Sequence, residues 1–138
     1  MTTSSLFRAA CAALIIAAAS PAAMGGVGET VTPQFAQAIP NIPGKSLVAA
    51  VVDYAPGGAS PSHVHASSAF IFGYVLSGAI ESQLDDGPKQ TYRTGESFAE
   101  PPGARHSVSR NASTTQPARL LAVFVVDTGD KPLTTPVQ

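Results

Sequence analysis

Turn-forming residues divide most of this chain into short segments, and their spacing is the strongest constraint on the fold. Between the turns lie runs rich in valine, isoleucine and aromatic residues, such as Ser46–Tyr54, Ala69–Leu76 and Arg119–Asp127. No stretch beyond the N-terminal segment repeats its apolar residues with a helical period, so helices are not expected. Short strands at roughly ten-residue spacing predict an all-β sandwich or barrel. The turn signals are Pro56–Gly58, Gly78, Gly87–Pro88, Gly95 and Pro101–Gly103.

The first residues of the chain have the composition of a secretory leader. Arg8 supplies one positive charge, Ala9–Ala19 is an apolar run, and the small residues Ser20–Ala23 follow. This order predicts a signal peptide over residues 1–22 and a periplasmic or secreted mature protein. The apolar run is shorter than a membrane span of about 20 residues, so we expect no stable membrane anchor. Cys11 is the only cysteine, so the mature chain would have neither a disulfide nor a thiolate ligand.

The rest of the chain has the size and composition of one domain. The full sequence has 138 residues, a formal net charge of −1 and only 12% charged residues, without a basic stripe, so we expect no nucleic-acid partner. Residues 23–45 are rich in proline and small side chains and predict an extended N-terminal arm. Residues 46–128 would form the barrel, and residues 129–138 a C-terminal tail.

Three histidines, the only ones in the sequence, are the best candidates for chemistry. His63 and His65 are two positions apart, so on a strand both would face the same side, about 6.6 Å apart along it. His106 follows the Pro101–Gly103 turn, and a neighbouring strand could bring it to the same point. Three imidazoles bind Zn, Fe, Ni or Cu and leave coordination positions open, as in catalytic sites. The alternative is that all three are ordinary loop or turn residues.

The residues around these histidines resemble the two motifs of the cupin family. The resemblance covers residues 57–111; its one small irregularity is that the asparagine lies one position later than the motif places it. It implies a small double-sheet β-barrel of the jelly-roll type and a homodimer. It also implies one metal ion held by His63, His65 and His106. The matching residues are Gly57, His63, His65, Gly78, Gly95, Pro101, Gly103, His106 and Asn111.

The sequence departs from the family at one important position. The first cupin motif places a glutamate a few residues after its histidine pair. Residues 66–74 contain no carboxylate, and Phe70 or Ile71 stands near that place. The resemblance therefore transfers three ligands and no fourth. Three neutral imidazoles would leave the full charge of a divalent metal uncompensated, which favours anionic or enolate-like substrates.

Glu100 is the nearest spare carboxylate, because it ends the expected strand that enters the Pro101–Gly103 turn. It is a candidate fourth ligand or catalytic general base. The alternative, which the sequence favours, is a solvated strand end. We expect the aromatic residues Phe70, Phe72 and Tyr74 to pack in the core.

These features favour an exported metal-binding cupin that acts on a small molecule as a dioxygenase-like oxidoreductase. Fe(II) is the favoured divalent transition metal, because three histidines leave a face open for oxygen and a chelating substrate; Zn, Mn, Ni and Cu are alternatives. A non-redox metal-dependent isomerase or hydrolase is a second hypothesis. A small-ligand-binding cupin without catalysis is a third, and a purely structural barrel is a fourth. The fold does not choose among them, because one fold hosts many functions.

We predict that the leader is removed and that the mature protein starts between Ala23 and Gly26. The order of charged, apolar and small residues is the pattern that export and cleavage require. N-terminal sequencing of the protein recovered from the exported fraction should return a residue in this range. Recovery of Met1 would contradict the prediction.

Overall fold

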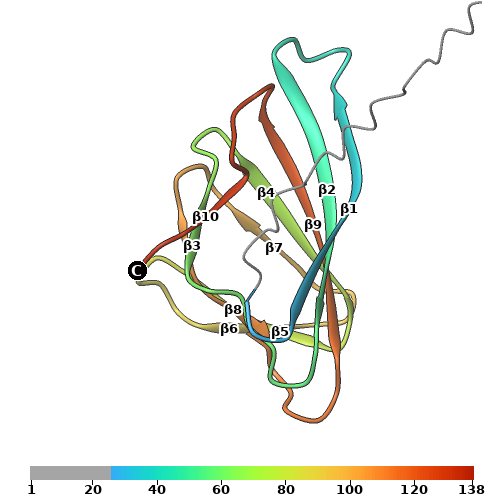
Figure 1. Cartoon of the computed structure of the whole chain (residues 1–138), viewed down its shortest axis with the longest axis vertical. Helices are drawn as coiled ribbons and strands as arrows, with labels where there is room; N and C mark the ends of the chain where they lie inside the picture. The colour runs from blue at the N-terminus through green and yellow to red at the C-terminus, as the bar shows by residue number, and fades with distance from the viewer. Residues whose placement is uncertain (1–25) are drawn as a thin grey trace, which may run out of the picture.

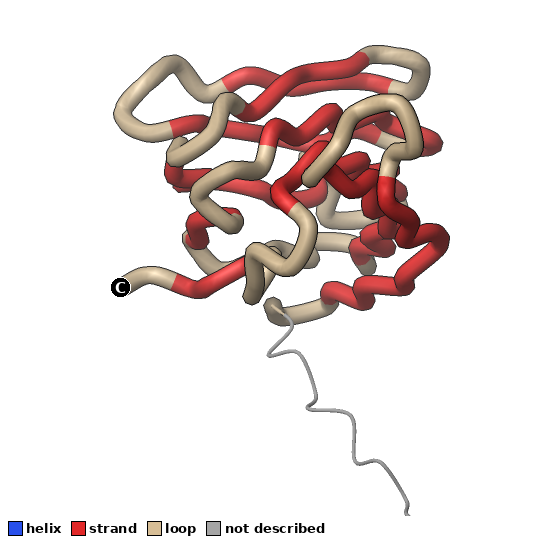
Figure 2. The backbone as a smooth tube through the Cα atoms, turned by 90° about the horizontal axis from the view of Figure 1, so that it is seen from above, coloured by secondary structure: helices blue, strands red, loops and turns tan. Residues whose placement is uncertain are grey.

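The computed structural model describes residues 26–138, which form ten β-strands and no helix (Figure 1, Figure 2). The predicted leader over residues 1–22, including Cys11, lies outside these residues. Within residues 26–138 there is no helix with the length and apolarity of a membrane span. The strands are β1 (Glu29–Ala38), β2 (Lys45–Tyr54), β3 (His63–His65), β4 (Phe70–Ser77), β5 (Ala79–Leu84), β6 (Gln90–Arg93), β7 (Ser97–Glu100), β8 (Arg105–Asn111), β9 (Ala118–Asp127) and β10 (Thr134–Pro136).

The strands form two five-stranded antiparallel sheets. One sheet has the order β1-β2-β9-β4-β7, and the other has the order β10-β3-β8-β5-β6. Figure 1 shows β1, β2 and β9 on one side of the molecule and β3 and β10 on the other. The predicted all-β fold with two sheets is therefore confirmed. Each sheet buries one face against the other, as antiparallel sheets commonly do.

The two ends of the described chain both take part in the sheets. The segment expected to be an extended arm, residues 23–45, supplies β1, which pairs with β2 over nearly its whole length. The expected tail, residues 129–138, supplies β10, which pairs with β3 and places Thr134 opposite His65. The C-terminal segment therefore lies beside the strand that carries two of the three histidines.

Strand β4 illustrates how the sheets build the interior. Ile71, Gly73 and Val75 face inward, and the residues between them face out. Gly73 is needed for packing, since a Cβ at this position would lie 2.7 Å from the ring of Phe98. Full burial of a branched side chain such as Ile71 stabilises the fold by roughly 1.5–3 kcal/mol. The core consists of two clusters, one containing Val75 and Phe98 and the other containing Ile71 and Phe124.

The outward side of β4 corrects one expectation. The prediction that Phe70, Phe72 and Tyr74 pack in the core is wrong, because their side chains are exposed. The strand's alternation decides this, since Ile71 and Val75 take the inward positions. The three aromatic residues lie opposite apolar residues of β9 and form with them an apolar surface, here called the outer face. Its members are Phe70, Phe72, Tyr74, Leu121, Val123 and Val125.

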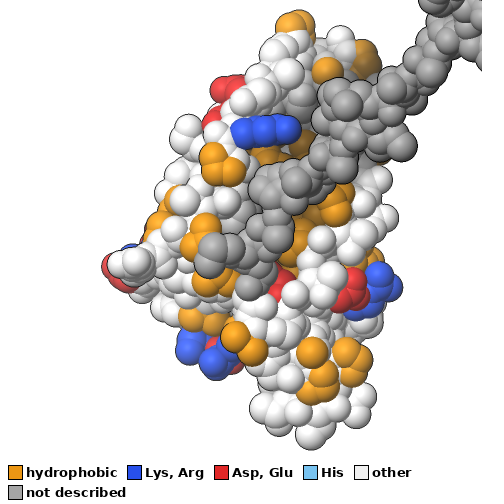
Figure 3. All heavy atoms as spheres, in the orientation of Figure 1, with side chains coloured by type: hydrophobic (Ala, Val, Ile, Leu, Met, Phe, Trp, Pro, Cys, Tyr) orange, Lys and Arg blue, Asp and Glu red, His pale blue; other side chains and the backbone are white. Residues whose placement is uncertain are grey.

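Charged side chains at the surface occur in pairs of opposite sign. Lys45 lies 2.6 Å from Asp127, and Arg119 lies 2.7 Å from Asp53. On the face shown in Figure 3, Lys and Arg side chains lie in small separate groups beside acidic ones. Nucleic acid requires a continuous basic surface, so the expected lack of such a partner remains a prediction that this charge pattern supports.

We predict that the homodimer expected from the family resemblance uses the outer face. Contiguous exposed apolar side chains commonly mark protein interfaces. Phe72→Glu would place a charge within the face and should convert a dimer into a monomer in light scattering at micromolar concentration. The matched control is Thr91→Glu, an exposed position on β6, which should stay dimeric. A monomeric wild-type protein would contradict the prediction.

Candidate metal centre

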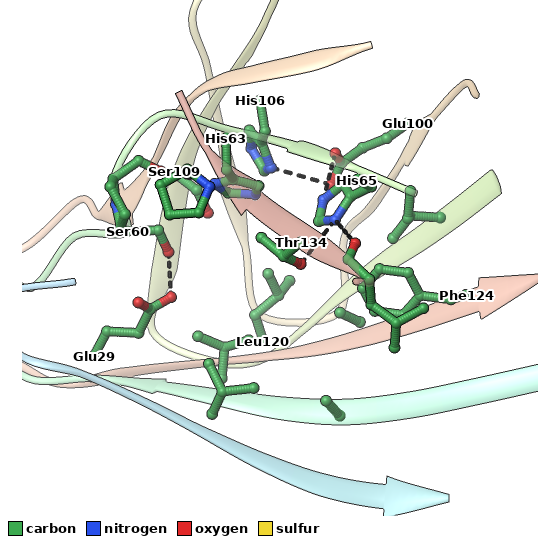
Figure 4. A pocket seen from close by; sticks show the side chains of 18 of the residues that line it. Glu29, Ser60, His63, His65, Glu100, His106, Ser109, Leu120, Phe124 and Thr134 are labelled. Atoms are coloured by element: carbon green, nitrogen blue, oxygen red, sulfur yellow. Dashed lines mark hydrogen bonds and ion pairs between the residues drawn. The ribbon is translucent and has the colours of Figure 1, made fainter. Parts of the chain in front are cut away.

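The three histidines meet where β3 pairs with β8. His63 lies directly opposite His106, and His65 follows two positions later on the same side of β3. The ring centroid of His63 is 4.8 Å from that of His65 and 5.1 Å from that of His106. One nitrogen of each ring lies within 4.8 Å of the other two (Figure 4). The structure therefore brings the three predicted ligands close enough for one metal ion to bind all of them.

A tight turn connects the two sheets at this place. The chain leaves one sheet at Glu100, the end of β7, and enters the other at Arg105, the start of β8. Between them the backbone N–H of Ala104 donates to the carbonyl of Pro101 at 3.2 Å. Gly103 has a φ of +80°, which glycine adopts without the steric cost that a Cβ brings. The residues on both sides of the turn consequently reach the same interior.

Two of the histidine rings are oriented by backbone carbonyls. Nδ1 of His63 donates to the carbonyl of Pro61 at 2.7 Å, and Nδ1 of His65 donates to the carbonyl of Leu133 at 3.1 Å. A carbonyl oxygen only accepts, so a neutral ring here carries its proton on Nδ1. The Nε2 lone pairs of both rings are then free for a metal, and these are the atoms that face the centre.

His106 is held in the opposite orientation. Its Nε2 forms a 2.8 Å hydrogen bond with Oγ of Ser82, which leaves Nδ1 for the centre. Both residues are buried, so this hydrogen bond is shielded from water. Each of the three rings thus has a partner on its outer nitrogen, as metal-binding histidines almost always do. The sequence offered no signal for Ser82, because it lies on β5, far from the histidine motifs.

Glu100 joins the histidines, so the expected solvated strand end is wrong. The residue is only 3% exposed, because β7 turns Phe98 and Glu100 inward and Ala99 outward. Its Oε1 lies 3.2 Å from Nδ1 of His106, and its Oε2 lies 3.3 Å from Nε2 of His65. A carboxylate therefore lies beside two of the three histidines, as a fourth potential ligand that the family resemblance does not supply.

The carboxylate of Glu100 reaches the site from a different strand than the cupin motif predicts. Ile71 stands near the place of the motif's glutamate, and it lies directly opposite Glu100 across β4 and β7. Residues opposite one another on adjacent strands share a face. The carboxylate therefore enters the same interior from the neighbouring strand. The local sequence sign of this placement is that Glu100 lies two positions after Phe98, so both side chains face the same side of β7. The sign predicts a buried carboxylate only when it is known which side of β7 faces the interior.

The ionisation of these groups suits a divalent cation. Burial raises the pKa of the Glu100 carboxyl, but hydrogen bonds and positive charge from His106 and His65 outweigh it and lower the pKa to about 2. Burial lowers the pKa of His63, which favours its neutral form. A metal site needs an ionised carboxylate and neutral imidazoles, and Glu100 and His63 meet this need.

An unsatisfied buried atom also indicates a cation. Oε2 of Glu100 is buried, and its close neighbour, Nε2 of His65, can donate to it only when that ring carries protons on both nitrogens. When His65 is neutral, with its proton on Nδ1, its Nε2 lone pair faces this oxygen at 3.3 Å, so two acceptor atoms point at one another. Burying a charged acceptor without a partner is costly. A metal ion at the centre would satisfy these atoms at once, so the donor set fits a metal.

The four groups open onto a cavity of about 540 Å³ that residues of both sheets line. This volume lies within the ~300–1,000 Å³ of small-molecule sites. The wall is mostly apolar and draws on both core clusters. It includes Val52, Ile71, Leu120, Ala122, Phe124 and Leu133.

Comparison with known proteins agrees with this geometry. A family model described as "Cupin domain" matches residues 50–124, which is more than half of the chain. The chain belongs to the cupin family. The resemblance seen in the motif spacing is therefore confirmed, and the matched range contains all three histidines and Glu100.

Two of the similar proteins are longer than this cupin. Germin-like protein subfamily 2 member 2 of Arabidopsis thaliana is 32% identical over 102 residues, which are 71% of this chain and 45% of the relative. An oxalate oxidase in complex with the substrate analogue glycolate has a TM-score of 0.60 and 26% identity, over 80% of this chain and 55% of its own. This cupin thus spans about half the length of either protein.

A third similar structure shows the fold alone. The cupin domain of an XRE-family transcriptional regulator from Enterobacter cloacae has a TM-score of 0.57 and 22% identity, over 70% of this cupin and 95% of that domain. That domain is part of a regulator, so the shared barrel does not by itself assign an activity to this chain.

We predict that Ser82→Ala weakens metal binding by about 10–100-fold, because His106 loses the partner that orients its ring. Any single His→Ala change at the three ligands should remove most of the metal. Affinity is measured by competition with a chromophoric chelator, with thermal unfolding recorded in parallel. Ser107→Ala is the control, since its hydroxyl bonds the carbonyl of Asp85 instead of a ligand. Equal affinity of the Ser82 and Ser107 variants would contradict the role given to Ser82.

Proposed function

We propose that this protein is an exported, metal-dependent cupin enzyme that oxidises a small molecule in an oxygen-dependent, dioxygenase-like reaction. One observation carries the proposal: one ring nitrogen of each of His63, His65 and His106 lies close to the other two in the interior, and the carboxylate of Glu100 lies beside His65 and His106. The adjoining cavity offers room for a substrate next to that point. Export is supported by the N-terminal leader predicted from the sequence.

The donor set favours Fe(II) or Mn(II). Imidazole suits iron and carboxylate suits manganese, and an octahedral ion with four protein ligands keeps two positions for other molecules. When bound, such an ion would supply one-electron chemistry and a place for oxygen and substrate to meet. Glu100 would reduce the net charge of the centre to about +1. The preference for anionic or enolate-like substrates was argued from three neutral ligands, so that argument no longer applies.

The protein's own residues would perform the remaining tasks. Glu100 is ionised and buried, so it can hold positive charge at the centre. Pro61, Leu133 and Ser82 fix the ligand rings and thereby the direction of the ligand atoms. The apolar wall limits water around the reacting groups, which strengthens electrostatic interactions there.

The comparisons support an oxidative reaction over the alternatives. The oxalate oxidase, an oxidase by its name, shares 26% identity and most of this fold. A non-redox isomerase or hydrolase that uses zinc is the second candidate, because three imidazoles with one carboxylate are also acceptable zinc ligands. A ligand-binding cupin without turnover is the third. Metal identity and oxygen uptake separate these three candidates.

The test begins with metal analysis of untagged protein purified without chelators. We expect about one Fe or Mn per chain, and oxygen consumption with small oxygen-containing substrates such as diketones, flavonols or catechols. Glu100→Gln should lower metal affinity by roughly 3 kcal/mol, or ~100-fold, because it removes the charged partner of a buried cationic centre. Asp86→Asn, at an exposed position, is the charge-matched control.

Each outcome separates the hypotheses. Stoichiometric zinc without oxygen uptake would favour the non-redox enzyme. Stoichiometric Fe or Mn without turnover of any substrate would favour a binding protein. Protein that takes up no metal, or a triple His→Ala variant that keeps its metal, would refute the proposed centre.

A further inference from the structure

The cavity has different chemistry at its two ends. The metal end is formed by the three histidines and Glu100. A second polar group of the lining, here called the Glu29 end, contains Glu29, Ser60 and Ser109 (Figure 4), together with Tyr54, which contacts both serines. The rest of the described lining is mostly apolar, and the lining contains no lysine or arginine. A ligand therefore meets a cationic centre at one end when metal is bound, and a carboxylate at the other.

The Glu29 end is a chain of hydrogen bonds with one direction. Oγ of Ser60 donates to Oε1 of Glu29, because a carboxylate only accepts. Ser60 has then used its single hydrogen, so the hydroxyl of Tyr54, at 2.6 Å, must donate to it. Tyr54 has likewise used its hydrogen, so Oγ of Ser109, at 2.9 Å, must donate to Tyr54. Every hydroxyl hydrogen in the chain therefore points toward Glu29.

This direction limits what the Glu29 end can offer a ligand. All three hydroxyl hydrogens are committed, so the hydroxyl and carboxylate oxygens present only lone pairs. The second oxygen of Glu29 already accepts from the backbone N–H of Gly26 at 2.5 Å. Tyr54 and Ser109 are buried, so water cannot readily replace these bonds. Burial raises the pKa of Tyr54 to about 12, which keeps its proton in place.

We propose that the cavity selects a molecule with a mostly apolar body, a metal-binding oxygen group at one end and a hydrogen-bond donor, a hydroxyl or an amine, at the other. The donor is bound by the acceptor oxygens of the Glu29 end. This assignment rests on the proposed function, because the oxygen group is bound at the metal end. Small dicarboxylates such as oxalate are poor ligands. Their second carboxylate finds no cation in the cavity, and their size leaves most of its apolar wall uncovered.

The test uses ω-hydroxyalkanoates of increasing chain length, each compared with the alkanedioate of the same length, and oxalate. Binding to the protein as purified, with its metal content measured, is followed by isothermal titration calorimetry. At the best-fitting length the hydroxy acid should bind at least about tenfold more tightly than the dioate, since a repelled carboxylate replaces a hydrogen bond to a charged group. Oxalate should bind more weakly than that hydroxy acid.

Glu29→Gln tests the residue that causes the selection. Its amide oxygen can still accept from Ser60, and its amide N–H supplies the donor that the wild-type end lacks. The preference for the hydroxy acid should therefore fall to about threefold or less. Asp86→Asn removes one exposed negative charge and should leave the preference unchanged. Thermal unfolding of both variants confirms that they are folded.

The results distinguish this inference from the proposed function. His106→Ala should weaken both members of each pair and leave their ratio unchanged. A ratio near one at every length overturns the inference. So does oxalate binding more tightly than every hydroxy acid, or no binding of any probe at millimolar concentration to metal-loaded protein. Preference for the hydroxy acid in protein that binds no metal would overturn the proposed function and leave the selectivity of the Glu29 end intact.

Discussion

The pairing of β3 with β8 is the interaction on which the site depends. It sets His63 opposite His106, and the two-residue period of a strand then places His65 on the same face. A slip of one residue would turn the histidines of β3 to the outside. This strand has only three residues, and it is held from both sides by β8 and β10. The C-terminal segment therefore maintains the register and also orients His65 through the carbonyl of Leu133.

Metal binding and folding are coupled in such an arrangement. Three imidazoles and a carboxylate in a buried space oppose folding unless their charges and lone pairs are satisfied. The contact of Oε1 of Glu100 with Nδ1 of His106 relieves part of this cost, but Oε2 has no donor when His65 is neutral. A ligand that binds only the folded state stabilises it in proportion to the logarithm of its concentration. The metal would thus complete the site and stabilise the barrel together.

The cavity is lined by residues of both hydrophobic core clusters. Protein interiors are normally packed as densely as organic crystals, so about 540 Å³ of open space is too large for a packing defect. Tyr54 of the first cluster and Phe124 of the second both line the cavity. The same residues therefore stabilise the barrel by packing and also leave open the space that a ligand would fill.

The sequence by itself determined the all-β class, the three histidines and the family. These depend on local patterns: turn residues at short intervals, two histidines one strand repeat apart, and a Pro-Gly turn before the third. It did not determine the outward direction of Phe70, Phe72 and Tyr74. All three are as apolar as core residues, and only the packing of Ile71 and Val75 decides which side of β4 is buried.

The tertiary structure alone decided the fourth donor, the partners of the rings and the chemistry of the cavity. Glu100 reaches the centre because β7 pairs with β4, and Ser82 reaches His106 because β5 pairs with β8. Glu29 and Ser60 are brought together across 31 positions of sequence. Strand register is set by burial over the whole sheet, so it determines contacts between residues whose local sequence carries no sign of one another.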